Sequence, residues 1–549
     1  MLPLRVALAQ IDTTVGAFEA NAAAVREATA RARAAGAQLV VFPELTLTGY
    51  PPRDLLELRR FVDRSEATLA ALAAPADWSK GIAVAVGFAE RHGGIGAGVY
   101  NAAAVLQDGR VDRIRKRLLP TYDVFDERRT TDPGPPSAPV AIAGRRVGFT
   151  ICEDVWNDEA FWRTRRYPED PVTELVREGI DLLVNLSASP FAQGKSQLRE
   201  EMLAALCRRH RVPLAYANLV GGNDQLVFDG RSVALGADGG VSARGPAFED
   251  ALVLAWQERP LPPLPAAGSD AELDEIERAL ALGVRDYARK TGFSGALLGL
   301  SGGVDSALTA CLAVRALGPD AVRGVALPSR FTSSMSDEDA ERLARALGIR
   351  FDVVPIEPVF ERYLTSLTPV IGPPAGVTAE NLQSRVRGAL LMALSNQSGA
   401  LLLATGNKSE LSVGYTTLYG DLSGGLAPIG DVTKTAVYRL ARHQNRERDF
   451  IPERTLTRPP TAELRQGQTD QDTLPPYELL DEVVRLSTEE RLSADEIVAR
   501  GLPEGPVRQI LSLLVRSEYK RRQAPPILRV TSRAFGDGWR FPIAHRFER

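Results

Sequence analysis

The chain has 549 residues, of which 44% are hydrophobic and 25% charged, and its formal net charge is −3 at pH 7. A length above about 300 residues exceeds what one hydrophobic core supports, so two or three domains are expected. The nearly balanced charge gives no electrostatic basis for binding nucleic acid or a membrane surface. No apolar run reaches the roughly 18 residues that a membrane-spanning helix needs.

Cysteine and lysine usage adds two constraints. Three cysteines, together with an N-terminus that lacks the cationic start and long apolar core of a signal peptide, predict a cytoplasmic protein without a disulfide framework. Only seven of the 66 basic residues are lysine. A lysine that persists where arginine is otherwise used is a candidate for a position that arginine cannot fill, although chance explains any single one equally well. The seven are Lys80, Lys116, Lys195, Lys290, Lys408, Lys434 and Lys520.

The first half of the chain alternates short apolar strands with helical segments. Strands are expected at 4–12, 37–45, 81–90, 100–111, 145–156, 181–190, 212–222, 232–241 and 250–257, and a helix at 19–35. Many strands joined by Gly-rich turns, with two intervening helices, predict a four-layer α-β-β-α sandwich over residues 1–260.

A proline-rich segment, "ERPLPPLPAAGSD", predicts an extended linker over 261–269. The second domain, 270–549, opens with an amphipathic helix at 270–292. Strands are expected up to residue 299 and at 322–329, 350–357 and 399–407, with a helix at 337–348. This βαβ order predicts a Rossmann-like parallel sheet with helices on both faces. Residues 442–483 are polar and are expected to form a mobile loop that leads into a small helical C-terminal region.

Three polar residues each follow an apolar strand in the first half, where α/β enzymes place their chemistry. Glu44 ends "LVVFPEL", Lys116 follows "VDRIR", and Cys152 follows "RRVGFTI". A glutamate can act as the base for a thiol, and a lysine can stabilise the anion that develops on a carbonyl oxygen. A lone cysteine is more often a buried structural residue, so the three positions must be weighed together.

The segments "FPELTLTGYPPRDLL", "KRLLPTYDVFDERR" and "ICEDVW" resemble the Glu-Lys-Cys signatures of the nitrilase superfamily. The resemblance covers residues 1–260 and implies amide or nitrile hydrolysis through a cysteine thioester. It implies that Glu44 is the general base, Lys116 the oxyanion stabiliser and Cys152 the nucleophile. It further implies that Glu127 positions the lysine, and that glutamine is held by Tyr122, Ser189 and Lys195.

The stretch "LLGLSGGVDSAL" at 297–308 reads as a strand, a tight Gly-Gly turn and the start of a helix, which is typical of a phosphate-binding loop. No Gly-Lys-Ser/Thr follows, so it is not a Walker A loop. Asp305 would repel phosphate directly and is therefore predicted to hold Mg²⁺. The "SGGVDS" core resembles the pyrophosphate loop of N-type ATP pyrophosphatases. The ATP-binding residues implied are Gly299, Leu300, Ser301, Gly302, Gly303, Val304, Asp305, Ser306 and Thr405.

Four further segments, "TAENLQSRVRGALLMALSN", "LLATGNKSELSVGYTTLYGD", "PIGDVTKTAVYRLA" and "SEYKRRQAPP", resemble NAD synthetases in sequence and order. The resemblance implies that Glu410 joins Asp305 at the metal. It also implies that ATP phosphates or the dinucleotide substrate, deamido-NAD, are bound by Asn381, Arg385, Glu410, Lys434 and Lys520.

The whole chain thus resembles the glutamine-dependent NAD synthetases. The resemblance implies that ATP adenylates deamido-NAD, that ammonia released from glutamine attacks the adenylate, and that a shielded path keeps the ammonia unprotonated. It also implies a homo-oligomer.

Two rival hypotheses remain at this point. Another glutamine-dependent amidotransferase with an N-type ATP pyrophosphatase domain, making GMP or asparagine, would carry a Cys-His-Glu triad or an N-terminal cysteine, whereas residue 2 is leucine. A non-catalytic nucleotide sensor would not need Glu44, Cys152 and Asp305 intact. Pyrophosphate exchange that depends on deamido-NAD separates the three hypotheses.

Overall fold

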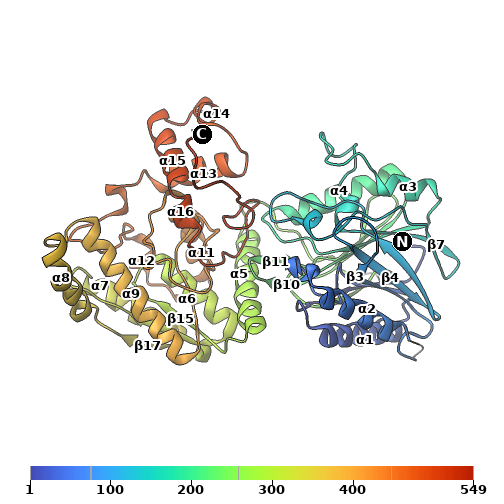
Figure 1. Cartoon of the computed structure of the whole chain (residues 1–549), viewed down its shortest axis with the longest axis horizontal. Helices are drawn as coiled ribbons and strands as arrows, with labels where there is room; N and C mark the ends of the chain where they lie inside the picture. Colours follow the sequence, from blue (N-terminus) through green and yellow to red (C-terminus); the bar gives the residue numbers. More distant parts are fainter. Residues whose placement is uncertain (1, 75–76, 258, 447, 548–549) are drawn as a thin grey trace. The chain divides into compact units, whose positions relative to one another are not determined.

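The computed structural model describes residues 2–74, 77–257, 259–446 and 448–547. The chain divides into two compact units, Met1–Ala267 and Gly268–Arg549 (Figure 1). Each unit has its own sheets and its own hydrophobic core.

The N-terminal unit contains two six-stranded sheets, in the orders β14-β1-β2-β3-β4-β5 and β13-β12-β9-β8-β7-β6. The first comprises β1 (Val6–Gln10), β2 (Leu39–Val41), β3 (Ala83–Arg91), β4 (Val99–Gln107), β5 (Arg110–Arg115) and β14 (Ala251–Leu254). The second comprises β6 (Val140–Ile142), β7 (Arg145–Ile151), β8 (Leu182–Ser187), β9 (Leu214–Asn218), β12 (Val233–Leu235) and β13 (Val241–Arg244). A separate ribbon pairs β10 (Val220–Asn223) with β11 (Leu226–Asp229).

The two sheets face each other, and helices cover their outer faces. Side chains such as Leu8 and Val41 of the first sheet pack against Phe149 and Val184 of the second. Outside the first sheet lie α1 (Phe18–Ala34) and α2 (Arg59–Ala73), and outside the second lie α3 (Pro171–Arg177) and α4 (Lys195–His210). The expected α-β-β-α sandwich is therefore confirmed, with four α-helices where the sequence predicted two.

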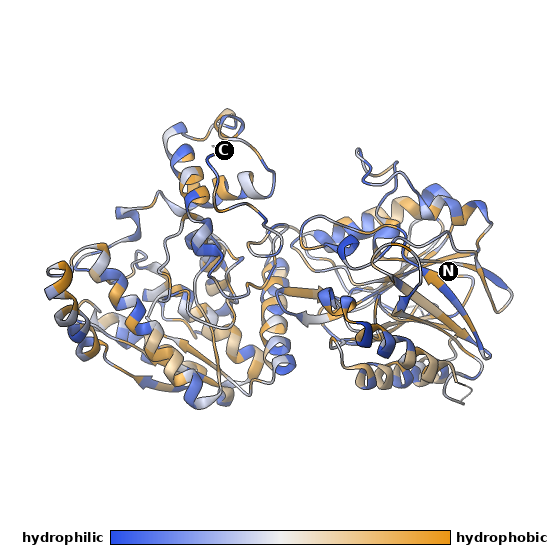
Figure 2. Ribbon diagram, in the orientation of Figure 1, coloured by the Kyte–Doolittle hydropathy of each residue, from blue (hydrophilic) through white to orange (hydrophobic). Residues whose placement is uncertain are grey.

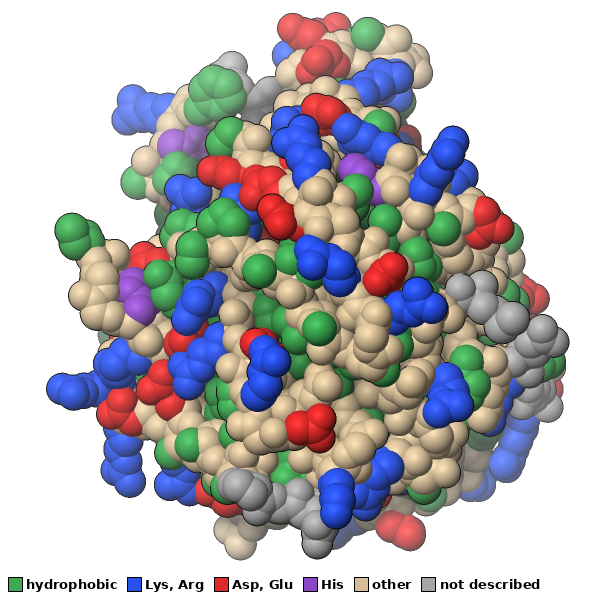
Figure 3. Space-filling view, turned by 90° about the vertical axis from the view of Figure 1, so that its right-hand side faces the viewer, with side chains coloured by type: hydrophobic (Ala, Val, Ile, Leu, Met, Phe, Trp, Pro, Cys, Tyr) green, Lys and Arg blue, Asp and Glu red, His purple; other side chains and the backbone are tan. Residues whose placement is uncertain are grey.

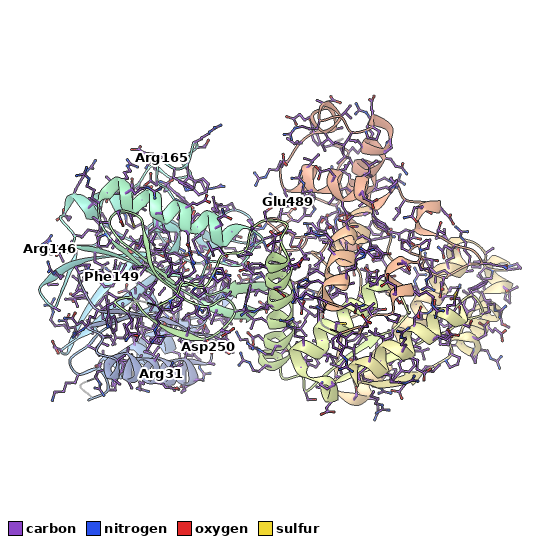
Figure 4. All side chains as sticks on the ribbon, turned by 180° about the vertical axis from the view of Figure 1, so that it is seen from behind. Arg31, Arg146, Phe149, Arg165, Asp250 and Glu489 are labelled. Carbon is purple, nitrogen blue, oxygen red and sulfur yellow. The ribbon has the colours of Figure 1, made fainter. Side chains whose placement is uncertain are left out.

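Apolar alternation along the strands explains the layering, because neighbouring side chains of a strand point to opposite faces. On β7, Phe149 is buried inside the sandwich while Arg146 lies at the surface, as does Arg31 of α1 (Figure 4). The strands of this unit are largely apolar in Figure 2, whereas its helices carry polar outer faces. Basic and acidic side chains lie intermixed on the surface in Figure 3.

The C-terminal unit is built on a parallel sheet in the order β17-β16-β15-β18. Its strands are β15 (Ala296–Gly299), β16 (Val322–Ala326), β17 (Arg350–Val353) and β18 (Leu401–Leu402). The chain reverses its direction of strand addition at β15, and α/β folds bind ligands at such a switch point. The expected parallel-sheet fold is confirmed, although β18 spans two residues instead of the predicted nine.

Helices pack on this sheet and extend beyond it. The loop after β15 leads into α6 (Val304–Leu317), which packs on β15 and β16, while α9 (Val377–Ser398) packs on β15 and β18. The other helices before residue 450 are α5 (Asp270–Thr291), α7 (Ser334–Leu347), α8 (Glu357–Ile371), α10 (Lys408–Val413) and α11 (Lys434–Gln444).

The small helical C-terminal region predicted after residue 483 is present, but helices already occur from residue 453. The chain after residue 450 contains α12 (Glu453–Thr457), α13 (Tyr477–Thr488), α14 (Ala494–Ala499), α15 (Glu504–Arg516) and α16 (Glu518–Arg521). Two of these, α12 and α13, begin inside the segment 442–483 that was expected to be a loop. Among the described residues, none of the helices is long and apolar enough to cross a membrane.

Candidate active sites

The predicted Glu-Lys-Cys residues of the N-terminal unit meet in one buried cluster. Glu44 follows β2 and Lys116 follows β5, so the first sheet supplies both. Cys152 follows β7 of the facing sheet and begins a 3₁₀ turn. Glu127 lies on another 3₁₀ turn, Glu127–Arg129, within the loop after Lys116. The packing of the two sheets therefore brings together residues that are far apart in the chain.

Lys116 is the centre of this cluster. Its ammonium donates to Glu44 Oε1 at 2.7 Å and to both carboxylate oxygens of Glu127 at 2.8 and 2.7 Å. The side chains of Lys116 and Glu44 are both fully buried. Burial alone lowers the pKa of Lys116, but the charges of Glu127 and Glu44 outweigh it and hold that pKa well above its usual value. The lysine is thus a fixed cation with no solvent neighbours.

Glu44 is held by three donors. Asn101 Nδ2 and Lys116 Nζ both donate to Oε1 at 2.7 Å, whereas Oε2 receives only the backbone N–H of Ala188, at 3.2 Å. Oε1 is therefore occupied by two strong donors, and Oε2 is the oxygen better able to accept a proton from a neighbour.

Cys152 has a strained backbone and a neutral thiol. Its φ of +44° lies in the left-handed region, which non-glycine residues adopt mainly where the surrounding structure enforces it. Burial raises the pKa of the thiol, and the charge of Glu44 raises it further, while Lys116 and a hydrogen bond from Ser187 lower it. The thiol is consequently protonated at neutral pH and needs a base in order to react.

The three residues predicted to hold glutamine lie around the cysteine turn. The Tyr122 hydroxyl donates to both oxygens of Glu153, the residue after Cys152, at 2.9 and 3.0 Å. The backbone N–H of Ser189 donates to Asn218 Oδ1 at 2.9 Å. Lys195 begins α4, and its ammonium donates to Pro190 O at 2.9 Å and lies 5.7 Å from the Trp156 ring centre.

Two functional neighbours were missed in the sequence. Asn101 lies inside β4, and a buried asparagine within an otherwise apolar strand was the available signal. Glu153 was not predicted as a site residue, yet it accepts hydrogen bonds from Tyr122 and Tyr167. Burial raises the pKa of Glu153.

In the C-terminal unit, the "SGGVDS" loop runs from β15 into α6. Gly302 has a φ of +75°, and a Cβ there would lie 2.4 Å from Ser336 O, so only glycine allows this approach to α7. Ser301 and Ser306 hydroxyls lie 3.2 Å apart, and the Ser306 hydroxyl donates to Gly303 O. The helix begins at Val304, so Asp305 lies in its first turn.

Asp305, Glu410 and Lys434 form the second cluster. The Lys434 ammonium pairs with Asp305 Oδ2 and lies 3.4 Å from Glu410 Oε1. Burial raises the pKa of Glu410, and the charges of Asp305 and Asp470 raise it further against the opposing effect of Lys434. Asp305 and Glu410 keep 18% and 16% of their side chains exposed, so both side chains reach the surface of the unit.

The other predicted ligand-binding residues gather on the loop that follows α10. Asn381 Oδ1 accepts from the Thr417 hydroxyl at 2.8 Å, and Arg385 Nε donates to Leu418 O at 3.2 Å. Lys520 donates to the carbonyls of Gly414 and Thr416, both at 2.7 Å. Thr405 lies in the loop between β18 and α10, at the same edge of the sheet as the loop after β15. The structure thus brings Asp305, Glu410 and Lys434 into one group, and Asn381, Arg385 and Lys520 into another.

A third group of ligand-type residues, Asp274, Glu277 and His443, lies elsewhere in this unit. Arg446 pairs with Asp274, and Arg315 pairs with Glu277. Two guanidinium groups therefore already neutralise its carboxylates.

Comparison with known proteins identifies both units. The carbon-nitrogen hydrolase family matches residues 5–257, and the NAD synthase family matches residues 276–524. The chain therefore belongs to a class of two-domain enzymes in which a carbon-nitrogen hydrolase is joined to an NAD synthase.

Full-length relatives narrow the class. The chain is 46% identical to a glutamine-dependent NAD(+) synthetase from Synechocystis, and 42% identical to one from Thermotoga maritima, over 99% and 100% of both chains respectively. It is also similar to the structure of a glutamine-dependent NAD+ synthetase from Acinetobacter baumannii in complex with ADP, at 37% identity, a TM-score of 0.75 and 98% coverage of both chains. The chain belongs to the glutamine-dependent NAD(+) synthetase family.

Proposed function

We propose that the two units divide the reaction of this family between the two clusters described above. The N-terminal cluster hydrolyses glutamine to glutamate and ammonia. The C-terminal cluster adenylates deamido-NAD with ATP, releases pyrophosphate, and lets ammonia displace AMP to give NAD. The observation that carries the proposal is that each matched unit brings together, from distant parts of the chain, a cluster of charged side chains that its half-reaction needs.

In the N-terminal unit, the chemistry starts with a proton transfer. Glu44 Oε2 takes the proton of the Cys152 thiol, and the sulfur attacks the carboxamide carbon of glutamine. Lys116 stabilises the oxyanion that forms. When the C–N bond breaks, Glu44 returns the proton to the nitrogen, which leaves as ammonia. Water then attacks the thioester with Glu44 again as the base, and glutamate leaves as the thiol is restored.

Glu127 supports this sequence by holding Lys116. Both of its oxygens accept from the ammonium, so the lysine points at the reacting oxygen without rotating freely. Tyr122, Ser189 and Lys195 bind the amino acid end of glutamine in this proposal. Lys195 supplies a cation for the α-carboxylate, and its position beside Pro190 and Trp156 keeps it close to the cysteine turn.

In the C-terminal unit, ATP is bound by Thr405 and by the loop from Gly299 to Ser306. The phosphates or deamido-NAD are bound by Asn381, Arg385, Lys434 and Lys520. Asp305 and Glu410 fit a hard divalent cation, because they bring two carboxyl groups together and both side chains are partly exposed. When bound there, Mg²⁺ would neutralise the pyrophosphate that leaves. We further propose a cytoplasmic homo-oligomer.

Pyrophosphate exchange tests the proposal. With ATP, Mg²⁺ and labelled pyrophosphate but no nitrogen donor, deamido-NAD is expected to support label incorporation into ATP. Xanthylate and aspartate, the corresponding substrates of GMP and asparagine synthesis, are expected to support none. Exchange with either of these, or equal exchange without any acceptor, would contradict the assignment.

A further inference from the structure

Asn407 connects the two carboxylates of the second cluster. It immediately precedes α10 and is fully buried. Its side-chain Nδ2 donates to Asp305 Oδ1 at 2.8 Å, across 102 residues of sequence. Its side-chain Oδ1 accepts from the backbone N–H of Glu410 at 3.0 Å, and its own backbone N–H donates to Glu410 Oε2 at 3.3 Å.

The oxygen and the NH₂ group of the Asn407 side chain thus contact two different elements, α10 and α6. The oxygen caps the first turn of α10, which fixes where Glu410 leaves the helix. The NH₂ group reaches α6 and fixes Asp305. Because the amide is planar and buried, it ties Asp305 Oδ1 to the first turn of α10, where the Asn407 backbone N–H meets the Glu410 carboxylate.

Lys434 contacts the opposite oxygens of the same pair, Asp305 Oδ2 and Glu410 Oε1. Each carboxylate is therefore oriented from two sides, by a cation on one oxygen and by Asn407 on the other. Unlike Lys434, Asn407 adds no formal charge, so it orients the carboxylates without forming an ion pair with them.

We propose that Asn407 is a positioning residue for the cation site of Asp305 and Glu410, whose carboxylates it orients through its side-chain and backbone N–H groups. The inference rests on the proposed metal role of those two carboxylates. Removal of a group that orients a metal ligand typically lowers metal affinity by roughly 10- to 100-fold. A cap that served only the fold would lower stability and leave cation affinity unchanged.

Asn407→Ser separates the two roles. A serine hydroxyl still caps α10, but it is too short to donate to Asp305 Oδ1 at the same time. The full-length variant is expected to bind Mn²⁺, measured by electron paramagnetic resonance of the free ion, about 10-fold more weakly than wild type. The Mg²⁺ concentration that half-saturates ammonia-dependent synthesis is expected to rise in parallel, with most activity regained at high Mg²⁺.

Ser493→Ala is the matched control, because Ser493 caps α14 through the Glu496 N–H in the same unit but touches neither carboxylate. It is expected to lower the unfolding temperature without changing Mn²⁺ affinity. Asp305→Asn and Glu410→Gln are run beside it. If both weaken Mn²⁺ binding and Asn407→Ser leaves it within twofold of wild type, the positioning role is wrong and the metal assignment survives. If Asp305→Asn and Glu410→Gln also bind Mn²⁺ normally, the metal assignment itself fails.

Discussion

The ammonium of Lys116 is held by three short contacts to carboxylate oxygens in a space without solvent. Arginine occupies the positions on both sides of it, Arg115 and Arg117. A guanidinium is broader and planar and cannot place one donor between two carboxylates as an ammonium does. The persistence of lysine here therefore has a steric explanation.

Lys116→Arg is expected to cripple glutamine hydrolysis although the charge is kept. In a close-packed site the wider group displaces Glu44, Glu127 or the substrate, and a misplacement of about 1 Å costs roughly 100-fold in rate. Glutamate release by the purified variant measures the effect. Lys80→Arg is the control, because Lys80 is exposed. More than about half of the wild-type rate in Lys116→Arg would remove the steric explanation.

Thiol reactivity is expected to differ sharply among the three cysteines. Burial raises the pKa of Cys207 and of Cys311 to about 12. Since the thiolate is the reactive form, only about 10⁻⁴ of each is reactive at pH 8, and this fraction grows tenfold per pH unit. Cys152 also has a raised pKa but lies beside Glu44, the proposed base.

Iodoacetamide, an analogue of a carboxamide, is therefore expected to label Cys152 first at pH 7.5, with glutamine protecting it. Glu44→Gln is expected to slow this labelling at least tenfold, because no base then takes the proton. Peptide mapping by mass spectrometry identifies the labelled residue. Equal labelling of Cys207 in the folded protein would show that Cys152 is not activated.

At the scale of elements, α4 is fastened to the ribbon β10-β11 by a buried ion pair. Arg199 of α4 donates to both oxygens of Asp229 at 3.2 and 2.8 Å, and each side chain is 1% exposed. Asp229 also accepts from Asn218, whose Oδ1 holds the backbone of Ser189. The pair therefore supports both the fold and one predicted glutamine contact.

Arg199→Met is expected to lower the free energy of unfolding by about 3–5 kcal/mol, because it leaves the Asp229 carboxylate buried without its cation. The KM for glutamine is expected to rise as Ser189 loses its support. Denaturant unfolding and glutaminase kinetics measure the two effects. In the exposed pair of Arg345 with Glu341, where the side chains are 76% and 58% exposed, Arg345→Met should cost about 1 kcal/mol or less. Similar losses of unfolding free energy in Arg199→Met and Arg345→Met would show that burial does not explain the contribution of the Arg199–Asp229 pair to stability.

The sequence predicted the elements whose pattern is local, and missed those that depend on distant partners. Glu44, Lys116 and Cys152 were recognisable because each follows an apolar strand, and the phosphate loop because its glycines stand between a strand and a helix. Asn101 and Asn407 were not predicted, because their partners are distant in the sequence. Asn101 contacts Glu44, and Asn407 contacts Asp305. The strand at 399–407 was predicted too long, because an apolar run there continues into the buried loop before α10.

At the scale of the whole molecule, each of the two clusters lies within one unit. A substitution in one unit should therefore abolish one half-reaction and leave the other intact. Cys152→Ala is expected to abolish NAD synthesis from glutamine and to leave synthesis from ammonium salts intact. Asp305→Asn is expected to suppress synthesis from both nitrogen donors. NAD formation is followed with each donor at saturating concentration. Equal loss with both donors in Cys152→Ala would contradict the assignment of one half-reaction to each unit.

The distribution of lysines has a practical consequence for labelling this enzyme. Of the seven, Lys116, Lys408 and Lys434 are at most 2% exposed and are paired with carboxylates, whereas Lys80 lies in the open. Reagents that acylate amines need an unprotonated, reachable nitrogen, and a buried ammonium between carboxylates offers neither. Attachment of a dye or a solid support through amines should therefore spare Lys116, Lys408 and Lys434 and fall on Lys80 and on the half-buried Lys195, Lys290 and Lys520. The two clusters would then keep the ammonium groups of Lys116 and Lys434.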